Sequence, residues 1–518
     1  MKKGNLISCI SVLLVLCLLM VSCKKKTDYV SVIPADAPLV ISLNIPLIIK
    51  KSGIANNASL KNKLTALLKD GLNAEGMQYV EKVIQNPSES GISITDKVYI
   101  FSTQSRQVGL VAKVNSLNKL QNAIEVIQKE GIPVQNLSKI NGYEAITIGN
   151  SNNTYCCFDD TKLILLMNAA GGASEGIKAE MERIVSLPAE QSMSANNGMV
   201  KMDGKKGDIV AYVNMDILPN SYVNMAKMNL PPNINLKDIS VIGALNFENG
   251  RVSFAGENYT ENEEVKKWYD KSASIVSKMN NSFANYFPAT LLYYIGMNMN
   301  GEKLNELLAD NPQYQQSISS LKAQGIELDK IISSIDGDIS IGLNSLNFRG
   351  VPEVSMYANV DGNEVLNAIN NAVTASKGRL TTIDNNNYSI NIAPGTNAYY
   401  GMKDNYFYFT TILGGNNVVG KKVDNPFSNA KWASLAKEST FYTVVNVREI
   451  FNLPFLGMIF SSGDPKAMMI KNVFSQFEYL EIATKSPQEF IANIETINKD
   501  TNSLQQFISL IEILTGMN

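Results

Sequence analysis

Apolar and polar residues alternate along many short segments of this chain, as the two faces of β-strands require. One such segment is PADAPLVISLN at residues 34–44, and a similar one, PATLLYYIGMN, stands at residues 288–298. Each is followed by a segment with helical spacing of its apolar residues, PLIIKKSGI in the first case and GEKLNELLA in the second. The chain therefore presents the same strand-then-helix pattern twice.

Other strand and hairpin patterns of the first half also recur in the second half, in the same order. Seven pairs of blocks begin at residues 34 and 288, 91 and 325, 108 and 354, 140 and 385, 154 and 398, 208 and 441, and 239 and 476. The pair that begins at residues 154 and 398 predicts two equivalent hairpins, with turns at Asp160 and Asp404. We therefore predict a tandem duplication, with a first α+β repeat domain at residues 29–284 and a second at residues 285–518. Because the strands form hairpins and helices are inserted only at fixed points, we expect a mainly antiparallel sheet with helices packed on one face.

The first residues have the pattern of an export signal. Lys2 and Lys3 precede an apolar run from Leu6 to Val21, which is too short to span a bilayer comfortably. Met20-Val21-Ser22 before Cys23 is similar to a bacterial lipobox, and we predict a signal peptide at residues 1–22 and a lipidated tether at residues 23–28. A retained transmembrane anchor is the alternative.

The residues that follow Cys23 indicate where the protein is anchored. Lys24, Lys25 and Lys26 suit contact with anionic lipid headgroups next to the lipid on Cys23. No acidic residue follows the cysteine directly, and this favours an outer-membrane lipoprotein that faces the periplasm rather than the cell surface. The membrane is thus the first expected partner.

Composition excludes several classes of function. The formal net charge is −2, so we expect no nucleic-acid partner. The chain contains no histidine, which excludes Ser-His-Asp and Cys-His triads and every zinc site that needs an imidazole. We predict no catalytic residue, no metal and no cofactor, and hence a protein that is not an enzyme. A carboxylate-dependent hydrolase acting on glycans or cell-wall material is the alternative, because spacing in sequence does not reveal two carboxylates that face each other.

Cys156 and Cys157 are neighbours in the strand pattern NTYCCFDD. Successive side chains of a strand point to opposite faces, so we expect one buried and one exposed thiol. A redox-active pair is the less favoured alternative.

The lipoprotein signal, the segment VIPADAPLVISLN and the following LIIKKSGI together resemble a family of Bacteroidetes lipoproteins. That family, numbered 4836, is catalogued as a domain of unknown function. The resemblance extends over the whole mature chain in length and in the order of elements. It implies no catalytic residue, so it adds to the predicted location and leaves the activity open.

Two groups of residues are candidates for contact with a partner. The Pro-bounded segments at 218–232 and 452–470 contain Met225, Met228, Met458, Met468 and Met469, whose flexible thioethers suit an adaptable binding surface. The alternative is that these segments fold inward as core helices.

In the strand pattern AYYGMKDNYFYFTT, Tyr406 and Tyr408 share one face. If exposed, this face would stack on a sugar or a peptide, and otherwise it is core. Together these observations predict a lipid-anchored envelope protein of unidentified activity, a binding or structural module for a protein, peptide or glycan partner.

Overall fold

The computed structural model describes residues 29–514 apart from short segments. These segments are residues 55–56, 59–60, 63–64, 66–70, 150–152, 169–174, 220–229, 232–233, 347–350, 376–379, 413 and 462. The predicted signal peptide and Cys23 therefore lie outside the described residues. In the part of the chain that is described, no helix combines the length and the hydropathy needed to cross a bilayer.

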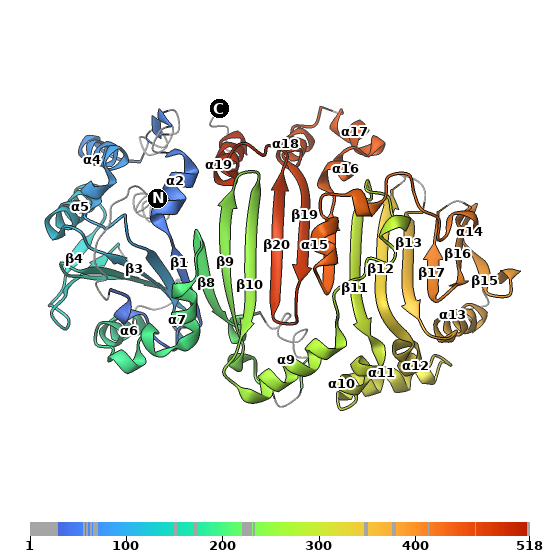
Figure 1. Cartoon of the computed structure of the whole chain (residues 1–518). Helices are drawn as coiled ribbons and strands as arrows, with labels where there is room; N and C mark the ends of the chain where they lie inside the picture. The colour runs from blue at the N-terminus through green and yellow to red at the C-terminus, as the bar shows by residue number, and fades with distance from the viewer. Residues whose placement is uncertain are drawn as a thin grey trace. The chain divides into compact units, whose positions relative to one another are not determined.

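The chain divides into two compact units (Figure 1). Unit 1 consists of the residues up to Leu218, of Ile239–Asn249 and of the residues from Asp500 onward. Unit 2 consists of Pro219–Asp238 and Gly250–Lys499. The predicted repeat domains, residues 29–284 and 285–518, were defined by repeated sequence and not by compactness. The division into compact units therefore does not test them, and they stay a prediction.

The strands of unit 1 are all antiparallel to their neighbours, in the order β9-β8-β1-β2-β3-β7-β6-β5-β4. In β6 and β7, Thr154 lies opposite Met167 and Phe158 opposite Leu163, which confirms the hairpin predicted around Asp160. The strands are β1 (Leu39–Leu43), β2 (Val98–Ser102), β3 (Gln107–Lys113), β4 (Val134–Asn136), β5 (Glu144–Ile148), β6 (Thr154–Phe158), β7 (Lys162–Asn168), β8 (Ile209–Asn214) and β9 (Ser240–Glu248).

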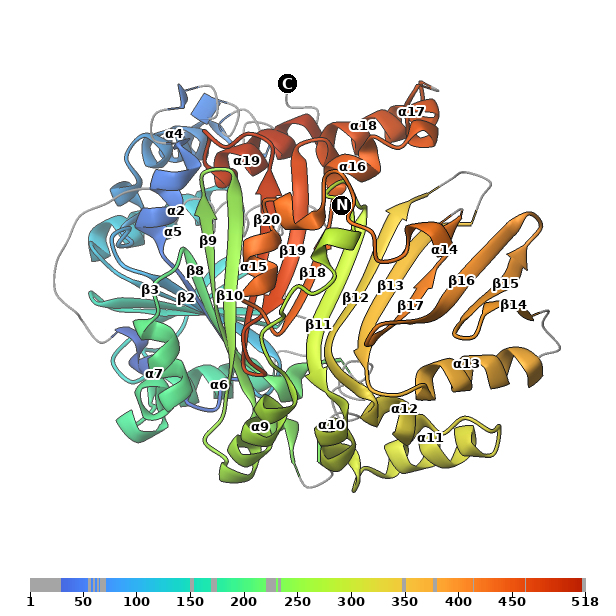
Figure 2. The ribbon, with the colours of Figure 1, turned by 45° about the vertical axis from the view of Figure 1, so that its right-hand side comes forward.

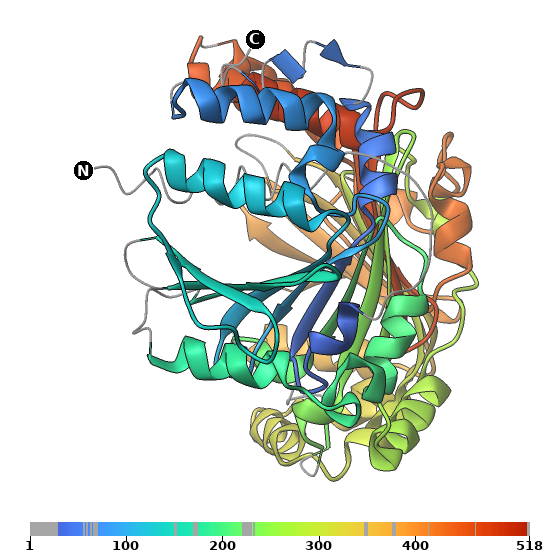
Figure 3. The same ribbon diagram turned by 90° about the vertical axis from the view of Figure 1, so that its left-hand side faces the viewer.

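Helices lie on both faces of the sheet in unit 1 (Figure 3). On one face, α4 (Ala74–Gln85) and α5 (Leu117–Lys129) share a cavity wall with Cys156 and Leu165 of the strands. On the other face, α6 (Glu175–Val185) packs against β6 and β7, and its Met181 is fully buried. Unit 1 also contains the helices α2 (Ile45–Ser52) and α7 (Asn197–Gly204). The prediction that helices cover one face is therefore wrong for unit 1.

Strand β6 shows why that prediction failed. All five of its residues, Thr154–Phe158, are buried, and Cys156 and Cys157 are both buried free thiols. The expected exposed thiol is therefore also wrong. Burial raises the pKa of Cys157 to about 12, which keeps the thiol protonated and unreactive at neutral pH. An unbroken apolar run such as TYCCF is typical of a strand covered on both faces, and this signal was present in the sequence.

The strands of unit 2 are also antiparallel, in the order β10-β20-β19-β18-β11-β12-β13-β17-β16-β15-β14. From β19 to β14 this order is that of β9 to β4 in unit 1, strand for strand. The strands are β10 (Arg251–Tyr259), β11 (Tyr293–Asn300), β12 (Ile335–Ser345), β13 (Glu353–Val360), β14 (Leu380–Asp384), β15 (Asn387–Ala393), β16 (Thr396–Lys403), β17 (Tyr406–Thr410), β18 (Phe441–Val445), β19 (Phe477–Thr484) and β20 (Glu489–Thr496).

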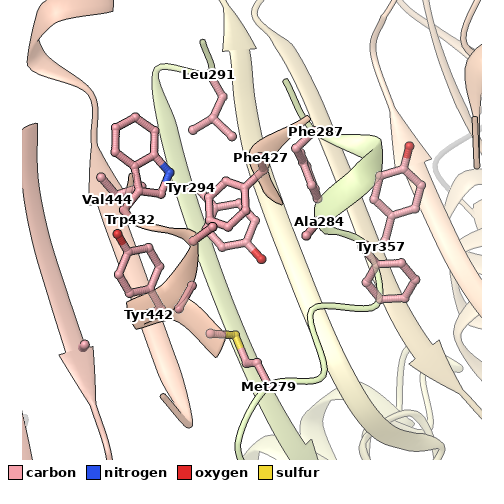
Figure 4. Close-up of a cluster of buried hydrophobic side chains, with 14 of the residues drawn as sticks. Met279, Ala284, Phe287, Leu291, Tyr294, Tyr357, Phe427, Trp432, Tyr442 and Val444 are labelled. Carbon is pink, nitrogen blue, oxygen red and sulfur yellow. The ribbon is translucent and has the colours of Figure 1, made fainter. Parts of the chain in front are cut away.

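Aromatic side chains dominate the core of unit 2 (Figure 4). Tyr294 and Tyr442 are fully buried, and Phe287 meets the Tyr294 ring edge to face at 5.4 Å between centroids. Their hydroxyl groups are hydrogen-bonded, Tyr294 to Ser340 at 2.9 Å and Tyr442 to the Glu481 carboxylate at 2.7 Å. Burial of these phenols therefore leaves no polar atom unpaired.

The helices of unit 2 are α9 (Glu263–Ile275), α10 (Gly301–Leu308), α11 (Pro312–Lys322), α12 (Leu328–Ser333), α13 (Glu364–Ala375), α14 (Gly415–Val418), α15 (Ala433–Lys437), α16 (Val447–Phe451), α17 (Pro454–Phe460) and α18 (Pro465–Phe474). Of these, α9 to α13 lie at one end of the strands and α16 to α18 at the other, while α15 lies over the strands (Figure 2). α10 begins at an asparagine cap, because Asn300 Oδ1 accepts a hydrogen bond from the Lys303 backbone N–H at 3.0 Å.

The last helix of each predicted repeat packs beside the first helix of the other repeat. In unit 2, α9 contacts α10. In unit 1, α2 contacts α19 (Ser503–Leu514), the last described helix of the chain, and Gln505 Nε2 donates a hydrogen bond to the Lys51 carbonyl at 3.2 Å. Each compact unit therefore contains an element from both predicted repeats.

Candidate binding surfaces

Three short helices follow strand β18 in unit 2 and carry the second predicted methionine segment. α16 begins where Asn446 Oδ1 accepts a hydrogen bond from the Glu449 backbone N–H at 3.3 Å. Pro454 and Pro465 stand in the first turns of α17 and α18, where proline costs no hydrogen bond. The Asp464 carboxylate caps α18 through the Lys466 backbone N–H at 3.0 Å.

These helices expose a group of large apolar side chains that we call the methionine surface. Its members are Met458, Met468, Met469, Ile470 and Phe474, of which Met458 is 66% exposed and Phe474 is 44% exposed. A single exposed apolar residue is ordinary, whereas several on adjoining helices are typical of an interaction site. Sequence analysis named Met458, Met468 and Met469 as candidate contact residues, with a core position as the alternative, and it did not name Ile470 or Phe474.

A stack of phenylalanine rings connects the helices that carry the methionine surface. The Phe451 ring lies 5.5 Å from that of Phe460 at an angle of 3°, and 5.6 Å from that of Phe474 at an angle of 11°. The Lys471 ammonium is 6.0 Å from the Phe460 ring centroid. These contacts join α16, α17 and α18, because each helix supplies one ring of the stack.

The methionine surface lies among basic groups. α18 contains Lys466 and Lys471, and neither α17 nor α18 contains an acidic residue. Asp464, just before α18, already accepts the capping hydrogen bond. The surface therefore suits a partner that offers apolar side chains flanked by negative charge.

The remaining predicted contact residues, Met225, Met228, Tyr406 and Tyr408, are not part of this surface. Met225 and Met228 lie outside the described residues. Tyr406 and Tyr408 are 7% and 3% exposed, so the prediction that they present an accessible tyrosine face is wrong. Strand β17 lies between β13 and β16, and its tyrosines face the aromatic core instead of solvent.

The contacts of Tyr406 and Tyr408 show that they are structural. The Tyr406 ring lies 5.4 Å from that of Phe283, and Tyr408 donates a hydrogen bond to Asn387 Oδ1 at 2.9 Å. Burial raises the pKa of Tyr408 to about 12. Strand alternation places the two tyrosines on one face, but only the packing of residues distant in sequence decides whether that face is covered.

Unit 1 contains a cavity of about 90 Å³ that sequence analysis did not predict. α4, α5 and the sheet line it almost entirely with apolar side chains, among them Leu72, Val80, Leu120, Ile127 and Leu165. An empty cavity of this size costs about 2 kcal/mol of stability, at ~24 cal/mol per Å³. Only the pairing of helices with strands far away in sequence reveals such a space.

Glu130 is the acidic residue in the wall of this cavity. Its Oε2 accepts a hydrogen bond from the Asn73 backbone N–H at 2.9 Å, while its buried Oε1 has no hydrogen-bond partner among the described residues. A Cβ at Gly76 would clash with the Glu130 carboxylate, so glycine at that position makes the close approach possible. The accessible lining of the cavity is therefore apolar, while the unpaired Glu130 oxygen is buried against Gly76.

A second cavity, of about 260 Å³, lies in unit 2. Trp268 forms part of its wall together with Lys267, Lys271, Leu307 and Asp310. Its mixture of an aromatic face with charged groups differs from the apolar cavity of unit 1. It suits a ligand that offers both hydroxyl groups and an apolar face.

Acidic side chains of the described residues can be compared with the needs of a metal site and with their charge partners. No group of three or more Cys, Asp or Glu side chains in the described part of the chain is placed to hold a metal ion. Glu478 and Glu495 are largely buried, but Lys431 pairs with Glu478 at 2.6 Å, and Lys499 with both carboxylates at 2.9 and 2.7 Å. These acidic groups therefore neutralise charges within the fold.

The fold is that of an α+β protein built on antiparallel sheet. The chain belongs to the family described as Domain of unknown function (DUF4836), whose model matches residues 29–504. This confirms the resemblance to the family of unknown function numbered 4836, whereas the lipoprotein part of that resemblance stays a prediction. Membership in this family assigns no activity.

Comparisons with characterised proteins add little. No curated protein matches the chain. The solved structure "Structure of crystal form I of TP0453" matches 49% of this chain and 88% of its own, with 11% identity and a TM-score of 0.25. A likeness this weak carries no argument about fold or function.

Proposed function

We propose that this chain is a lipid-anchored, non-enzymatic binding protein of the cell envelope. The lipobox before Cys23 supports lipidation, and Lys24, Lys25 and Lys26 support contact with an anionic leaflet. The absence of an acidic residue directly after Cys23 supports an outer-membrane lipoprotein that faces the periplasm. The absence of histidine supports a role that is not catalytic.

The partner that best suits the methionine surface is a protein or peptide with an apolar segment flanked by acidic residues. The observation that carries this proposal is the exposure of Met458, Met468 and Met469 on adjoining helices. Methionine side chains repack easily around different shapes, and the stacked phenylalanine rings connect the helices that carry them. Lys466 and Lys471 favour acidic flanks on the partner.

Site-specific photo-crosslinking in the native host tests this proposal. A photoreactive residue at Met469 should give one discrete cross-linked protein, and the same residue at exposed Ala323 should give none. The additional change Met458→Lys should abolish the product from position 469, because a charge would replace an apolar contact. Equal products from both positions, or binding of the purified protein to protein-free anionic vesicles through the methionine surface, would contradict the proposal.

A carboxylate-dependent hydrolase, the alternative class, would cleave cell-wall glycan, whereas a binding protein would not. Purified protein incubated with cell-wall glycan should release no new reducing ends. Release that is lost when one Asp or Glu is replaced by its amide would replace the binding proposal with the enzymatic one.

A glycan partner is a second candidate, supported by the cavity beside Trp268. An indole face stacks on a sugar ring, and Lys271 and Asp310 in the same wall supply a donor and an acceptor for hydroxyl groups. Trp268→Ala should then abolish binding on an envelope-glycan array, and Trp268→Phe should keep part of it. A Trp268→Ala variant that binds glycans as the wild type does would eliminate this candidate.

We also infer that the chain arose by tandem duplication. The shared strand order of the two units supports this inference. Asn214 and Asn446, which follow equivalent strands, both cap the next helical turn, through the backbone N–H groups of Asp216 at 3.1 Å and Glu449 at 3.3 Å. A structure-based alignment of the two halves in several family members tests this inference. If equivalent positions of the halves share residue types no more often than chance, the inference is contradicted.

A further inference from the structure

The methionines of the methionine surface are more exposed than the other methionines that the structure describes. Met458, Met468 and Met469 are 66%, 39% and 44% exposed, whereas every other methionine among the described residues is buried or half-buried. The three lie on α17 and α18, which contact each other. Small solutes therefore reach three thioether side chains on one surface.

Other side chains that react readily with oxidants are missing or less accessible in the described part of the chain. Cys156 and Cys157 are buried, and burial raises the pKa of both thiols, which keeps them protonated and slow to react. Trp432 is buried and Trp268 half-buried, and the chain contains no histidine. Because oxidation of a sulfur side chain follows its exposure, an oxidant reacts first at the methionine surface.

We propose that the methionine surface is a site of oxidation by peroxide, and that methionine sulfoxide formed there releases the bound partner. This inference rests on the proposed binding function. A thioether sulfur attacks one oxygen of hydrogen peroxide, so that an S–O bond forms and the O–O bond breaks. The proton on the transferred oxygen passes to the departing hydroxide, which leaves as water. Sulfur loses two electrons, and the peroxide gains them.

A sulfoxide changes what this surface binds. The thioether is apolar and repacks around a partner, whereas the sulfoxide carries an oxygen that accepts hydrogen bonds. A partner that covers this oxygen with apolar side chains leaves it without a donor, which should weaken binding about tenfold for each covered sulfoxide. Because the three methionines are exposed, their oxidation alters the contact surface and opens no core.

Brief treatment of the purified full chain with hydrogen peroxide, followed by digestion and mass spectrometry, tests the selectivity of oxidation. Met458, Met468 and Met469 should be oxidised on the order of tenfold faster than Met181 and Met199, which are fully buried. If either buried methionine is oxidised as fast as the three exposed ones, the proposal is overturned.

Photo-crosslinking from a photoreactive residue at Ile470, which is exposed, tests the effect on the partner. Oxidised protein, freed of peroxide and mixed with envelope proteins of the host, should give a cross-linked product about tenfold weaker than untreated protein gives. The matched control is the triple variant Met458→Leu, Met468→Leu and Met469→Leu. Leucine is apolar and has no sulfur, so peroxide treatment should leave the product of this variant unchanged.

The outcomes distinguish this inference from the binding proposal. Absence of any product from untreated protein would overturn both. A product that stays equally strong after oxidation of all three methionines would overturn this inference alone, and so would an equal loss of product in the leucine variant.

Discussion

The rings of Phe451 and Phe474 lie stacked 5.6 Å apart at an angle of 11°, although 22 residues separate them in the chain. Phe474 presents its other side to solvent as part of the methionine surface, so the stack links an exposed side chain to a half-buried one. The exposed helices α17 and α18 are therefore attached to the fold through α16.

Removal of the Phe451 ring should loosen the methionine surface. We expect Phe451→Ala to lower the free energy of unfolding by about 2 kcal/mol, less than the 3–5 kcal/mol typical of a fully buried phenylalanine. Denaturant unfolding measures this value, and hydrogen exchange should show faster exchange confined to α17 and α18. Phe451→Leu, the control, should cost less than half as much. Unchanged exchange in both helices would show that the stack does not hold them.

Substitutions on the methionine surface itself should leave stability nearly unchanged. Met458→Lys and Met469→Lys should each change the free energy of unfolding by less than about 0.5 kcal/mol, because both side chains are exposed. Both should also reduce self-association at high concentration, since apolar exposed area is removed. Thermal unfolding and light scattering provide the measurements. A loss of several kcal/mol would mean that these residues are packed against the fold.

Tyr408 should behave as a core residue. Tyr408→Phe removes the hydrogen bond to Asn387 and should cost about 1 kcal/mol, while Tyr408→Ala should cost about 4 kcal/mol through the cavity that it leaves. Denaturant unfolding of both variants checks the difference. Neither change should affect binding of glycans or peptides. If Tyr408→Phe is stable but no longer binds them, Tyr408 contacts the partner after all.

Glu481 should make stability depend on pH. Burial raises the pKa of this carboxyl above its usual value, against the lowering effects of hydrogen bonds from Asn493 and Tyr442. The folded protein therefore holds this proton more tightly than the unfolded chain does. As pH rises from the unfolded pKa through the folded pKa, this group makes unfolding progressively easier.

Comparison with Glu481→Gln isolates this contribution. The free energy of unfolding of the wild type should fall, relative to that of the variant, as pH rises from 4 toward neutral. Urea unfolding at several pH values gives both curves. If the difference between the two curves stays constant with pH, or if the wild type gains stability relative to the variant as pH rises, the expected direction of the pH dependence is wrong.

Removal of residues 500–518 should destabilise unit 1 and spare unit 2. These residues belong to unit 1, where α19 contacts α2 and Ile508 packs against the core beneath it. Hydrogen exchange should therefore increase in α2 and β1, whereas the aromatic core around Tyr294 should remain protected. Loss of protection in unit 2 instead would show that the C-terminal helix supports the second predicted repeat.

The sequence by itself determined most of the secondary structure. Alternation and turn residues located the hairpins around Asp160 and Asp404, and strands β6 with β7 and β16 with β17 confirm them. The methionine segment at 452–470 was also recognisable, because prolines bound it and apolar residues crowd it. These signals are local, since a turn or a helix cap depends on residues within a few positions.

Tertiary structure alone decided which of these surfaces face solvent. Tyr406 and Met458 were both candidate contact residues in the sequence, yet one is 7% exposed and the other 66%. The same holds for Glu130, whose carboxylate lies against Gly76 of another helix. Burial depends on which distant segment packs against a face, and no local pattern contains that information. The sequence determined the faces of the elements, and long-range packing determined which of them remain available for binding.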